Sequence, residues 1–324
     1  FGTIFQGIVD PDKRSENGMD YTSVPNIMKV IEPLFLNMLY DEFRAYQDKE
    51  GKLFELLERI CKIKIFDPAC GSGNFLIIAF KQLRNLQYQI LERINELRGG
   101  TLTGNQLNES FLIRIENFYG IEIDDFAHEL AVLSMHIAHQ QMNMEFDKEF
   151  GVSSPIIPLT DAPHIVCANA AKINWQDVCP NKPTTIVRDP NQFSQGSLID
   201  DGAVANTTQQ TVITQYDEIY LIGNPPYKGA KLQTPDQKAD FAKYFGDEPY
   251  SKSMDYIALW FIKGARYISG TRAQLAFVST NSVCQGEHVA VMFPKIYHCN
   301  EEIGFAYTSF KWKHTARDNA GVTG

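Results

Sequence analysis

The most specific chemistry of the sequence lies in five consecutive residues, Gly223-Asn224-Pro225-Pro226-Tyr227, which follow a short apolar stretch. The two prolines remove two N–H donors and fix the backbone, so that rigid carbonyl acceptors remain. Asn224 adds a side-chain carbonyl and Tyr227 adds a flat aromatic face. Acceptors that converge beside an aromatic ring suit an aromatic or amide NH₂ group. The alternative is a proline-rich turn without a ligand, and five specified residues at a strand end make it the weaker interpretation.

A second candidate site is the stretch Asp67-Pro68-Ala69-Cys70-Gly71-Ser72-Gly73-Asn74-Phe75, between a predicted strand and a predicted helix. Small residues let the backbone approach a ligand closely, and the first turn of a helix offers free N–H groups. The stretch contains neither GxGxxG nor the GK[ST] of a Walker loop, so a phosphate cradle is unsupported. The acidic residue at the strand end instead favours a cationic or hydroxyl-bearing ligand. A tight turn without a ligand is the alternative.

Two further polar residues follow predicted strands. Glu122 lies in Gly-Ile-Glu-Ile-Asp, where a carboxylate can accept both hydroxyls of a ribose, as the acidic residue of dinucleotide sites does. It lies much further beyond Asp67 than the ~20 residues of that fingerprint, so the intervening helix must be extended or paired. Asn169 could bond an adenine edge. The structural alternatives are a solvated charge at Glu122, a helix N-cap at Asp124 and a turn-stabilising amide at Asn169.

The elements that position these residues follow from apolar periodicity and turn residues. Apolar stretches predict strands over 63–66, 118–123, 164–167, 218–222, 273–279 and 302–306. Helical spacing predicts helices over 27–39, 53–60, 74–98, 125–144, 253–268 and 287–298, the first with Ser23 as its N-cap. Residues 175–216 are typical of an irregular insertion. The alternation of strands and helices predicts an α/β fold with a doubly wound, Rossmann-like sheet, whose ligands bind beyond the carboxyl ends of the strands.

Composition narrows the class of protein. Of the 324 residues, 44% are hydrophobic and 21% are charged, which excludes wholesale disorder. No apolar stretch approaches the ~18 residues that span a bilayer, so no membrane association is expected. The net charge of −9 disfavours a stand-alone nucleic-acid binder. Six scattered cysteines without a CxxC pair indicate reduced thiols in the cytoplasm, and His136 and His139 without a carboxylate partner indicate no metal site.

Together these segments resemble a known family. Asp67-Pro68-Ala69-Cys70-Gly71-Ser72-Gly73 and Asn224-Pro225-Pro226-Tyr227 are similar to the motifs of S-adenosylmethionine-dependent amino-methyltransferases that modify adenine N6 in DNA. Their order, with Tyr21-Thr22-Ser23 upstream, is that of the gamma group. Phe310-Lys311-Trp312 before an Ala/Asn-rich stretch is most similar to the methyltransferase part of MmeI-like type II (IIG/IIL) restriction–modification enzymes. The resemblance covers nearly the whole chain.

For the cofactor, the resemblance implies S-adenosylmethionine bound to a class I methyltransferase sheet. The methionine part is expected on Tyr21-Thr22-Ser23 and on residues 67–75, and the ribose on Glu122. Many relatives carry an aspartate near the cofactor's adenine where this chain has Asn169, so the amide keeps one acceptor and loses the charge. The expected cofactor site also includes the residues that follow Glu122 and Asn169 in sequence. These neighbours are Ile123 and Ala170.

For the reaction, the resemblance implies that Asn224 and Pro225 accept hydrogen bonds from the target N6 amino group, in a catalytic motif that Pro226 and Tyr227 complete. Tyr227 stacks on the base, and Phe310 is a candidate for its opposite face. Because adenine N6 lies inside the duplex, the base must flip out, at a cost of about a few kcal/mol. Methyl transfer would then be a direct in-line displacement, with no covalent enzyme intermediate and no metal.

Two domains are expected: an N-terminal helical segment over 1–50 with the Tyr-Thr-Ser motif, and a catalytic domain over 51–324. The chain starts with Phe1 and ends abruptly at Gly324, which suggests a piece of a longer protein. By the resemblance, a region that recognises the target sequence in double-stranded DNA follows residue 324, and a fused endonuclease can precede residue 1. These parts would supply the basic surface that this chain, with a net charge of −9, lacks. The whole protein is expected in the cytoplasm of a prokaryote.

Three other functions stay open. A methyltransferase with the same motif can act on a glutamine amide of a protein or on an rRNA base, since both present an NH₂ group to the two acceptors. A non-catalytic cofactor-binding scaffold for a specificity subunit is the third, which the intact Asn224–Tyr227 motif disfavours. The glycine-rich stretch and the Tyr-Thr-Ser segment favour DNA. A cytosine-C5 mechanism is excluded because Cys284 follows Val283 rather than a proline.

Overall fold

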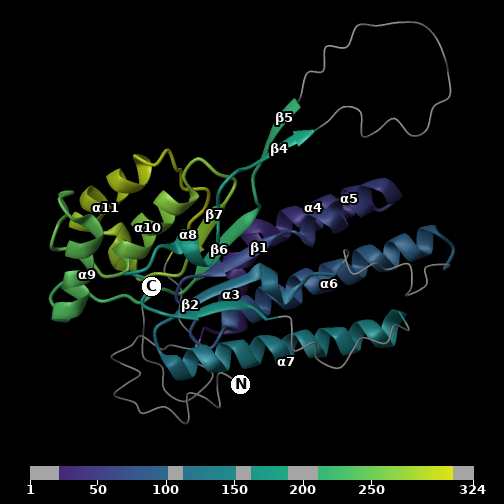
Figure 1. Ribbon diagram of the computed structural model, residues 1–324, viewed down its shortest axis with the longest axis horizontal. Helices are drawn as coiled ribbons and strands as arrows, with labels where there is room; N and C mark the ends of the chain where they lie inside the picture. Colours follow the sequence, from purple (N-terminus) through teal and green to yellow (C-terminus); the bar gives the residue numbers. More distant parts are fainter. Residues whose placement is uncertain (1–21, 101–111, 151–161, 189–210, 309–324) are drawn as a thin grey trace, which may run out of the picture.

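The computed structural model describes residues 22–100, 112–150, 162–188 and 211–308. Five parallel strands form the central sheet in the order β3-β2-β1-β6-β7 (Figure 1). The strand order reverses between β1 and β6, as in doubly wound sheets, so the predicted Rossmann-like α/β fold is confirmed. The strands are β1 (Lys64–Asp67), β2 (Phe118–Glu122), β3 (His164–Cys167), β6 (Ile219–Gly223) and β7 (Gln274–Phe277).

Successive residues of a strand point to opposite faces of the sheet, and here both faces are buried. Ile65, Phe118 and Tyr220 pack into one hydrophobic core. Their neighbours Phe66 and Tyr119 pack into a second core on the opposite face. This double burial explains why the strands are nearly continuous apolar stretches rather than strict apolar–polar alternations.

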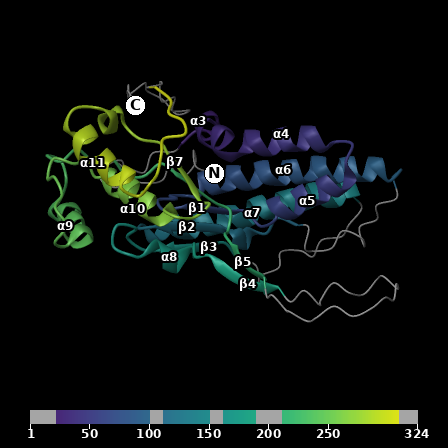
Figure 2. The same ribbon diagram turned by 90° about the horizontal axis from the view of Figure 1, so that it is seen from above.

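Helices cover both faces. On one face α6 packs on β1 and β2, α7 packs on β2 and β3, and α5 packs on α6. On the other face α8 packs on β2 and β3, α10 packs on β7, and α11 packs on α10. The long helices extend beyond one end of the sheet, whereas α9, α10 and α11 gather at the other end (Figures 1 and 2). The bounds are α5 (Glu50–Ile60), α6 (Asn74–Leu97), α7 (Asp125–Phe150), α8 (Trp175–Val178), α9 (Pro235–Phe245), α10 (Ala258–Ile268) and α11 (Glu287–Tyr297).

The helix predicted over 27–39 consists of three pieces. α3 (Val24–Ile31) leads into a π-helical turn (Glu32–Leu36), and α4 (Asn37–Tyr46) follows. Pro33 lies in the π-helical turn and has no N–H for the regular helical hydrogen bond, which explains the wider turn. Ser23 occupies the predicted N-cap position, although its side chain makes no capping hydrogen bond. These helices share a hydrophobic core with α6, and the domain boundary at residue 50 stays a prediction.

Two further predicted elements differ from the structure. The strand predicted over 302–306 is wrong, because residues 301–308 are described without any strand pairing and are mostly exposed. An alternating apolar pattern yields a strand only where a neighbouring strand supplies hydrogen bonds. The helix predicted over 253–268 begins later, at Ala258, because the residues before it hydrogen-bond to the loop after β6.

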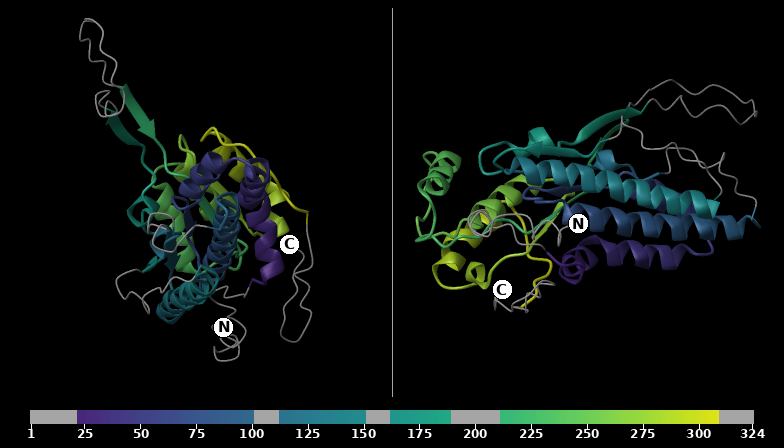
Figure 3. Two further views of the ribbon diagram at one scale, coloured as in Figure 1. Left: turned by 90° about the vertical axis from the view of Figure 1, so that its right-hand side faces the viewer. Right: turned by 90° about the horizontal axis from the view of Figure 1, so that it is seen from below.

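The interpretation of residues 175–216 as irregular is wrong for 175–188 and 211–215, while residues 189–210 lie outside the described residues. Besides α8, the described part contains an antiparallel pair, β4 (Thr184–Arg188) and β5 (Thr211–Gln215), in which Thr184 lies opposite Gln215. The pair projects away from the central sheet (Figures 1 and 3). Both strand segments are rich in β-branched residues, which favour strands.

Within the ranges that the structure describes, no helix has the length and hydropathy needed to cross a membrane. His136 and His139 lie on α7, and His139 Nε2 is 3.2 Å from the side-chain nitrogen of Asn143. Across the same ranges, no three His, Cys, Asp or Glu side chains gather as a metal site would need.

Candidate functional site

A cavity of about 980 Å³ lies beyond the carboxyl ends of β1, β2, β3 and β6. We call it the strand-end cavity. Parallel strands end at the same edge of a sheet, which is why residues far apart in sequence meet there. Most residues predicted for the cofactor and the target base line it: Thr22, Pro68, Ala69, Cys70, Gly71, Ser72, Asn74, Phe75, Glu122, Ile123, Asn169, Ala170, Asn224, Pro226 and Tyr227.

Some predicted site residues are not part of this lining. These are Ser23, Asp67, Gly73 and Pro225. Tyr21 and Phe310 fall outside the described residues. The Tyr-Thr-Ser segment is therefore represented in the cavity by Thr22, which is buried.

The loop after β1 contains two glycines with left-handed backbone. Gly71 has φ +54° and Gly73 has φ +83°, values at which a side chain with a Cβ is strained. The Gly73 amide donates to the Cys70 carbonyl at 2.8 Å, and the Cys70 amide donates to the Ile121 carbonyl of β2 at 3.0 Å. α6 starts directly after this turn, at Asn74. The loop thus brings small side chains and a helix N-terminus to the cavity.

Asp67 is buried at the end of β1, with 1% of its surface exposed. Its Oδ1 accepts a hydrogen bond from the Ala69 amide at 3.0 Å, while its Oδ2 has no partner among the described residues. Burial raises the pKa of this carboxyl to about 8. A Cβ at position 223 would lie 2.5 Å from Asp67 Oδ1, so β6 can approach this closely only with Gly223. Gly223 therefore belongs to the site, although the sequence analysis gave a role only to the residues that follow it.

Glu122 is buried and ties two loops together, so a solvated charge is the wrong interpretation. Its Oε2 accepts from the Gly71 amide at 2.8 Å and its Oε1 accepts from the Asp124 amide at 2.9 Å. Burial raises its pKa, and these backbone hydrogen bonds partly oppose the rise. Each carboxylate oxygen has a second lone pair, which leaves acceptors for ligand hydroxyls. Asp124 is the N-cap of α7, as one alternative predicted, because its Oδ1 accepts from the Ala127 amide at 2.9 Å.

Asn224 connects the two most distant motifs of the site. Its Nδ2 donates to Thr22 Oγ1 at 3.5 Å, across 202 residues of sequence. Its Oδ1 is buried and has no hydrogen-bond partner within the described ranges. A buried acceptor without a donor destabilises the free protein, by roughly 1–3 kcal/mol. Such an acceptor beside a cavity suits a ligand that brings an N–H group.

The segment after Tyr227 is held by residues that the motifs did not reveal. Asp255 Oδ1 accepts from the Lys228 amide at 2.8 Å. The Lys228 carbonyl accepts from the Tyr256 amide at 2.9 Å and from Gln233 Nε2 at 3.0 Å. These bonds fix the backbone that follows the two prolines. The sequence offered one signal for this role of Asp255: an acidic residue directly between Met254 and Tyr256.

α10 supports the loops after β1 and β3 through two buried side chains. Trp260 Nε1 donates to the Pro68 carbonyl at 3.2 Å. Lys263 Nζ donates to the carbonyls of Ala170 at 2.8 Å and Ile173 at 2.9 Å. Burial lowers the pKa of Lys263 to about 8. Helical periodicity alone indicates core residues at these positions, so sequence reasoning could not assign them to the site.

Asn169 stabilises the turn after β3. Its Oδ1 accepts from the Ala171 amide at 2.8 Å, which is the turn-forming alternative stated for this residue. Its Nδ2 points to a carboxylate on α9, with 3.4 Å to Asp240 Oδ2. A contact with an adenine edge stays a prediction, and the amide oxygen already has one donor.

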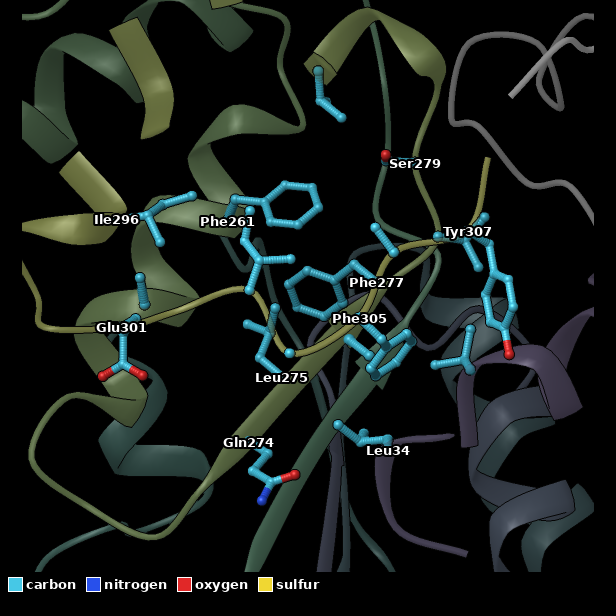
Figure 4. A pocket seen from close by; sticks show the side chains of 18 of the residues that line it. Leu34, Phe261, Gln274, Leu275, Phe277, Ser279, Ile296, Glu301, Phe305 and Tyr307 are labelled. Atoms are coloured by element: carbon cyan, nitrogen blue, oxygen red, sulfur yellow. The ribbon is translucent and has the colours of Figure 1, made fainter. Parts of the chain in front are cut away.

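A second cavity, of about 860 Å³, runs alongside β7, the last strand of the sheet order (Figure 4). We call it the edge cavity. Aromatic side chains from three elements meet in it, among them Phe261, Phe277 and Phe305. Asn224 and Tyr227 line both cavities, so the catalytic motif of the prediction lies between them.

Two curated proteins are similar to this chain, the first over nearly its whole length. DNA methyltransferase A of Bacillus subtilis (strain 168) is 44% identical over 323 residues, which are 99% of this chain and 32% of that protein. A putative type II restriction enzyme and methyltransferase of Methanocaldococcus jannaschii is 30% identical over 143 residues, which are 44% of this chain and 11% of that protein.

A solved structure agrees with these similarities. The type IIL restriction–modification enzyme MmeI in complex with DNA matches with a TM-score of 0.80 and 34% identity, over 99% of this chain and 38% of that one. The chain thus spans about a third of the length of DNA methyltransferase A and somewhat more of MmeI. The family model of the MmeI DNA-methyltransferase domain matches residues 43–324. The chain therefore belongs to the MmeI DNA-methyltransferase family.

Proposed function

We propose that this chain transfers the methyl group of S-adenosylmethionine to the N6 amino group of a flipped-out adenine in double-stranded DNA, as part of a restriction–modification system. The observation that carries the proposal is the buried Asn224 Oδ1, which borders the strand-end cavity and has no donor among the described residues. Membership of the MmeI DNA-methyltransferase family supports methyl transfer to DNA.

The residues present fit such a cofactor. The strand-end cavity, at about 980 Å³, is as large as the upper range of small-molecule sites, ~1,000 Å³. Glu122 lines this cavity and retains lone pairs that suit ribose hydroxyls. When bound, S-adenosylmethionine supplies an activated methyl group on a sulfonium. Residues 67–75 with Thr22 would hold its methionine part, and Asn169 with Ala170 would lie beside its adenine.

Asn224 and Pro225 act on the target base. Their carbonyl oxygens accept hydrogen bonds from N6, whose lone pair is otherwise delocalised into the ring, and so favour a more tetrahedral, more nucleophilic nitrogen. Thr22 holds the Asn224 amide with its oxygen free for this bond. Tyr227 stacks on the flipped base, and Phe310 is proposed for the opposite face. Positioning and electrostatics then supply the rate enhancement.

Recognition of the DNA sequence is proposed to lie outside residues 1–324. DNA affinity requires basic residues that neutralise phosphates, and this chain has an excess of acidic residues, with a net charge of −9. The matched region makes up 32% of DNA methyltransferase A and 38% of MmeI, which leaves room for such a part, and for an endonuclease, in the whole protein. We therefore expect residues 1–324 by themselves to bind DNA weakly.

The test is methyl transfer by the full-length protein from isotopically labelled S-adenosylmethionine. DNA is digested to nucleosides, and mass spectrometry identifies the labelled base. Label in N6-methyldeoxyadenosine supports the proposal, whereas label in N4-methyldeoxycytidine would keep DNA as substrate and change the base. Label found only in protein glutamine or rRNA would contradict the DNA substrate. Cofactor binding without transfer to any acceptor would indicate the scaffold function instead.

A further inference from the structure

Asp240 places a buried carboxylate at the β3 end of the strand-end cavity. It lies in the middle of α9, a helix that begins with a capping box formed by Thr234 and Gln237. Only 2% of the Asp240 surface is exposed, and the residue belongs to the cavity lining. The motifs of the sequence do not include it. A buried acid that borders a ligand cavity needs partners, and these partners indicate its purpose.

The two carboxylate oxygens differ in their partners. Oδ2 accepts a hydrogen bond from the Tyr256 hydroxyl at 2.6 Å, and Asn169 Nδ2 lies 3.4 Å away. Oδ1 is buried and has no hydrogen-bond partner among the described residues. The half-exposed Lys172 amine, 3.6 Å from Oδ1, supplies a counter-charge beyond hydrogen-bond distance. One side of the carboxylate is therefore fixed, while the other side retains a free acceptor.

The location of Asp240 indicates that it would contact the cofactor rather than the target base. Asp240 contacts Asn169, which follows β3, whereas the acceptors for the target base follow β6. β3 and β6 are three strand spacings apart in the sheet, about 14 Å. Glu122, the proposed ribose partner, ends β2 next to β3. The adenine end of a cofactor whose ribose lies at Glu122 is thus the part that reaches the β3 side.

The chemistry of this end calls for an acceptor. An exocyclic NH₂ group donates hydrogen bonds, and a carboxylate accepts them more strongly than a neutral amide. Asn169 Oδ1 is already engaged by the Ala171 amide, and its Nδ2 is a donor directed at Asp240. Asn169 therefore orients the carboxylate, and Asp240 presents the free acceptor.

We propose that Asp240 is a specificity residue for the cofactor, with its Oδ1 accepting a hydrogen bond from the exocyclic amino group of the cofactor's adenine. The inference rests on the proposed function, because it assumes an adenosyl cofactor in the strand-end cavity. It also assigns a role to α9, which lies outside the central sheet and carries none of the motifs.

The test compares two ligands by calorimetry: S-adenosylhomocysteine and S-inosylhomocysteine, in which a carbonyl replaces the amino group. We expect the native protein to bind the adenosyl compound about tenfold to a hundredfold more tightly, the range for a hydrogen bond to a charged group. Asp240→Asn should reduce this preference to less than about threefold, because its amide can also donate to a carbonyl. Asp247→Asn, an exposed acid just after α9, should keep the full preference.

Each result decides between the proposals. A full preference in Asp240→Asn would overturn the inference and leave the proposed function intact. Failure of the native protein to bind S-adenosylhomocysteine would overturn both. If thermal unfolding shows that Asp240→Asn does not fold, Asp240→Glu replaces it, since one added methylene moves the carboxylate. The preference must then fall at least about threefold, and an unchanged preference would overturn the inference.

Discussion

The strand-end cavity and the edge cavity have similar volumes, about 980 and 860 Å³, and different linings. The first contains the buried acids Glu122 and Asp240, and Asp240 Oδ1 has no hydrogen-bond partner among the described residues. The second is lined mainly by apolar side chains, among them Phe277 of β7, Phe261 of α10 and Ile296 of α11 (Figure 4). The strand-end cavity is lined by loops that follow parallel strands, and these loops carry polar residues. The edge cavity lies beside the edge strand β7, where most side chains are apolar. Volume by itself therefore does not distinguish the two cavities, whereas the buried acids occur in the lining of the first.

The largest effect is expected at Asn224, which lines both cavities. Asn224→Ala in the full-length protein should lower kcat for methyl transfer by about 10²–10³-fold, as for loss of one preorganised polar group. The affinity for S-adenosylmethionine should stay within about threefold, because the free acceptor serves the target base. Single-turnover kinetics and calorimetry measure the two quantities.

Asn37→Ala is the matched control, because Asn37 is exposed on α4. It should retain both transfer and cofactor affinity. An equal loss of affinity and of kcat in Asn224→Ala would assign this acceptor to the cofactor and remove the distinction between the two ends of the strand-end cavity.

The next effect tests how closely β6 approaches β1. In Gly223→Ala the new Cβ would lie 2.5 Å from Asp67 Oδ1, a buried group that cannot move freely. We expect the free energy of unfolding to fall by about 1–3 kcal/mol and cofactor binding to weaken with it. Denaturant unfolding measures the first quantity. Gly229→Ala, where no atom lies within 4 Å of the added Cβ, should change stability by less than about 0.5 kcal/mol.

The free energy of unfolding should depend on pH through the buried carboxyl of Asp67. The pKa of Asp67 is raised to about 8, above the ~4 of an unfolded chain, so the native state holds one more proton between these values. The stability that this group contributes is complete below ~4 and is lost as the pH rises through about 8. Unfolding experiments at several pH values should show this decline in the native protein and a smaller one in Asp67→Asn. Identical declines would contradict the assignment to Asp67.

The smallest effect is expected in the edge cavity. Phe305 is 36% exposed and belongs to residues 301–308, which make no strand pairing. Phe305→Ala should therefore change stability by no more than about 0.5 kcal/mol and leave S-adenosylmethionine affinity unchanged. Calorimetry of the variant checks this. A marked loss of affinity would show that the two cavities act as one site.

Much of the fold was predictable, because the three inner strands, β1, β2 and β6, are short, buried apolar stretches that end at turns. The strands at Lys64–Asp67 and Phe118–Glu122 are examples. The β4–β5 pair and the missing strand over 302–306 were not predictable in the same way. A strand exists only with a partner, and apolar period does not reveal which segments find one.

The sequence by itself determined the motif residues and their order along strands that alternate with helices, which is why most of them meet in the strand-end cavity. It could not show that Gly223 makes room for Asp67, or that Trp260 and Lys263 hold the loops after β1 and β3. The tertiary structure decided these contacts, because they join segments far apart in sequence through single side-chain atoms. Periodicity records which residues are buried, whereas only the folded chain establishes which buried donor meets which acceptor.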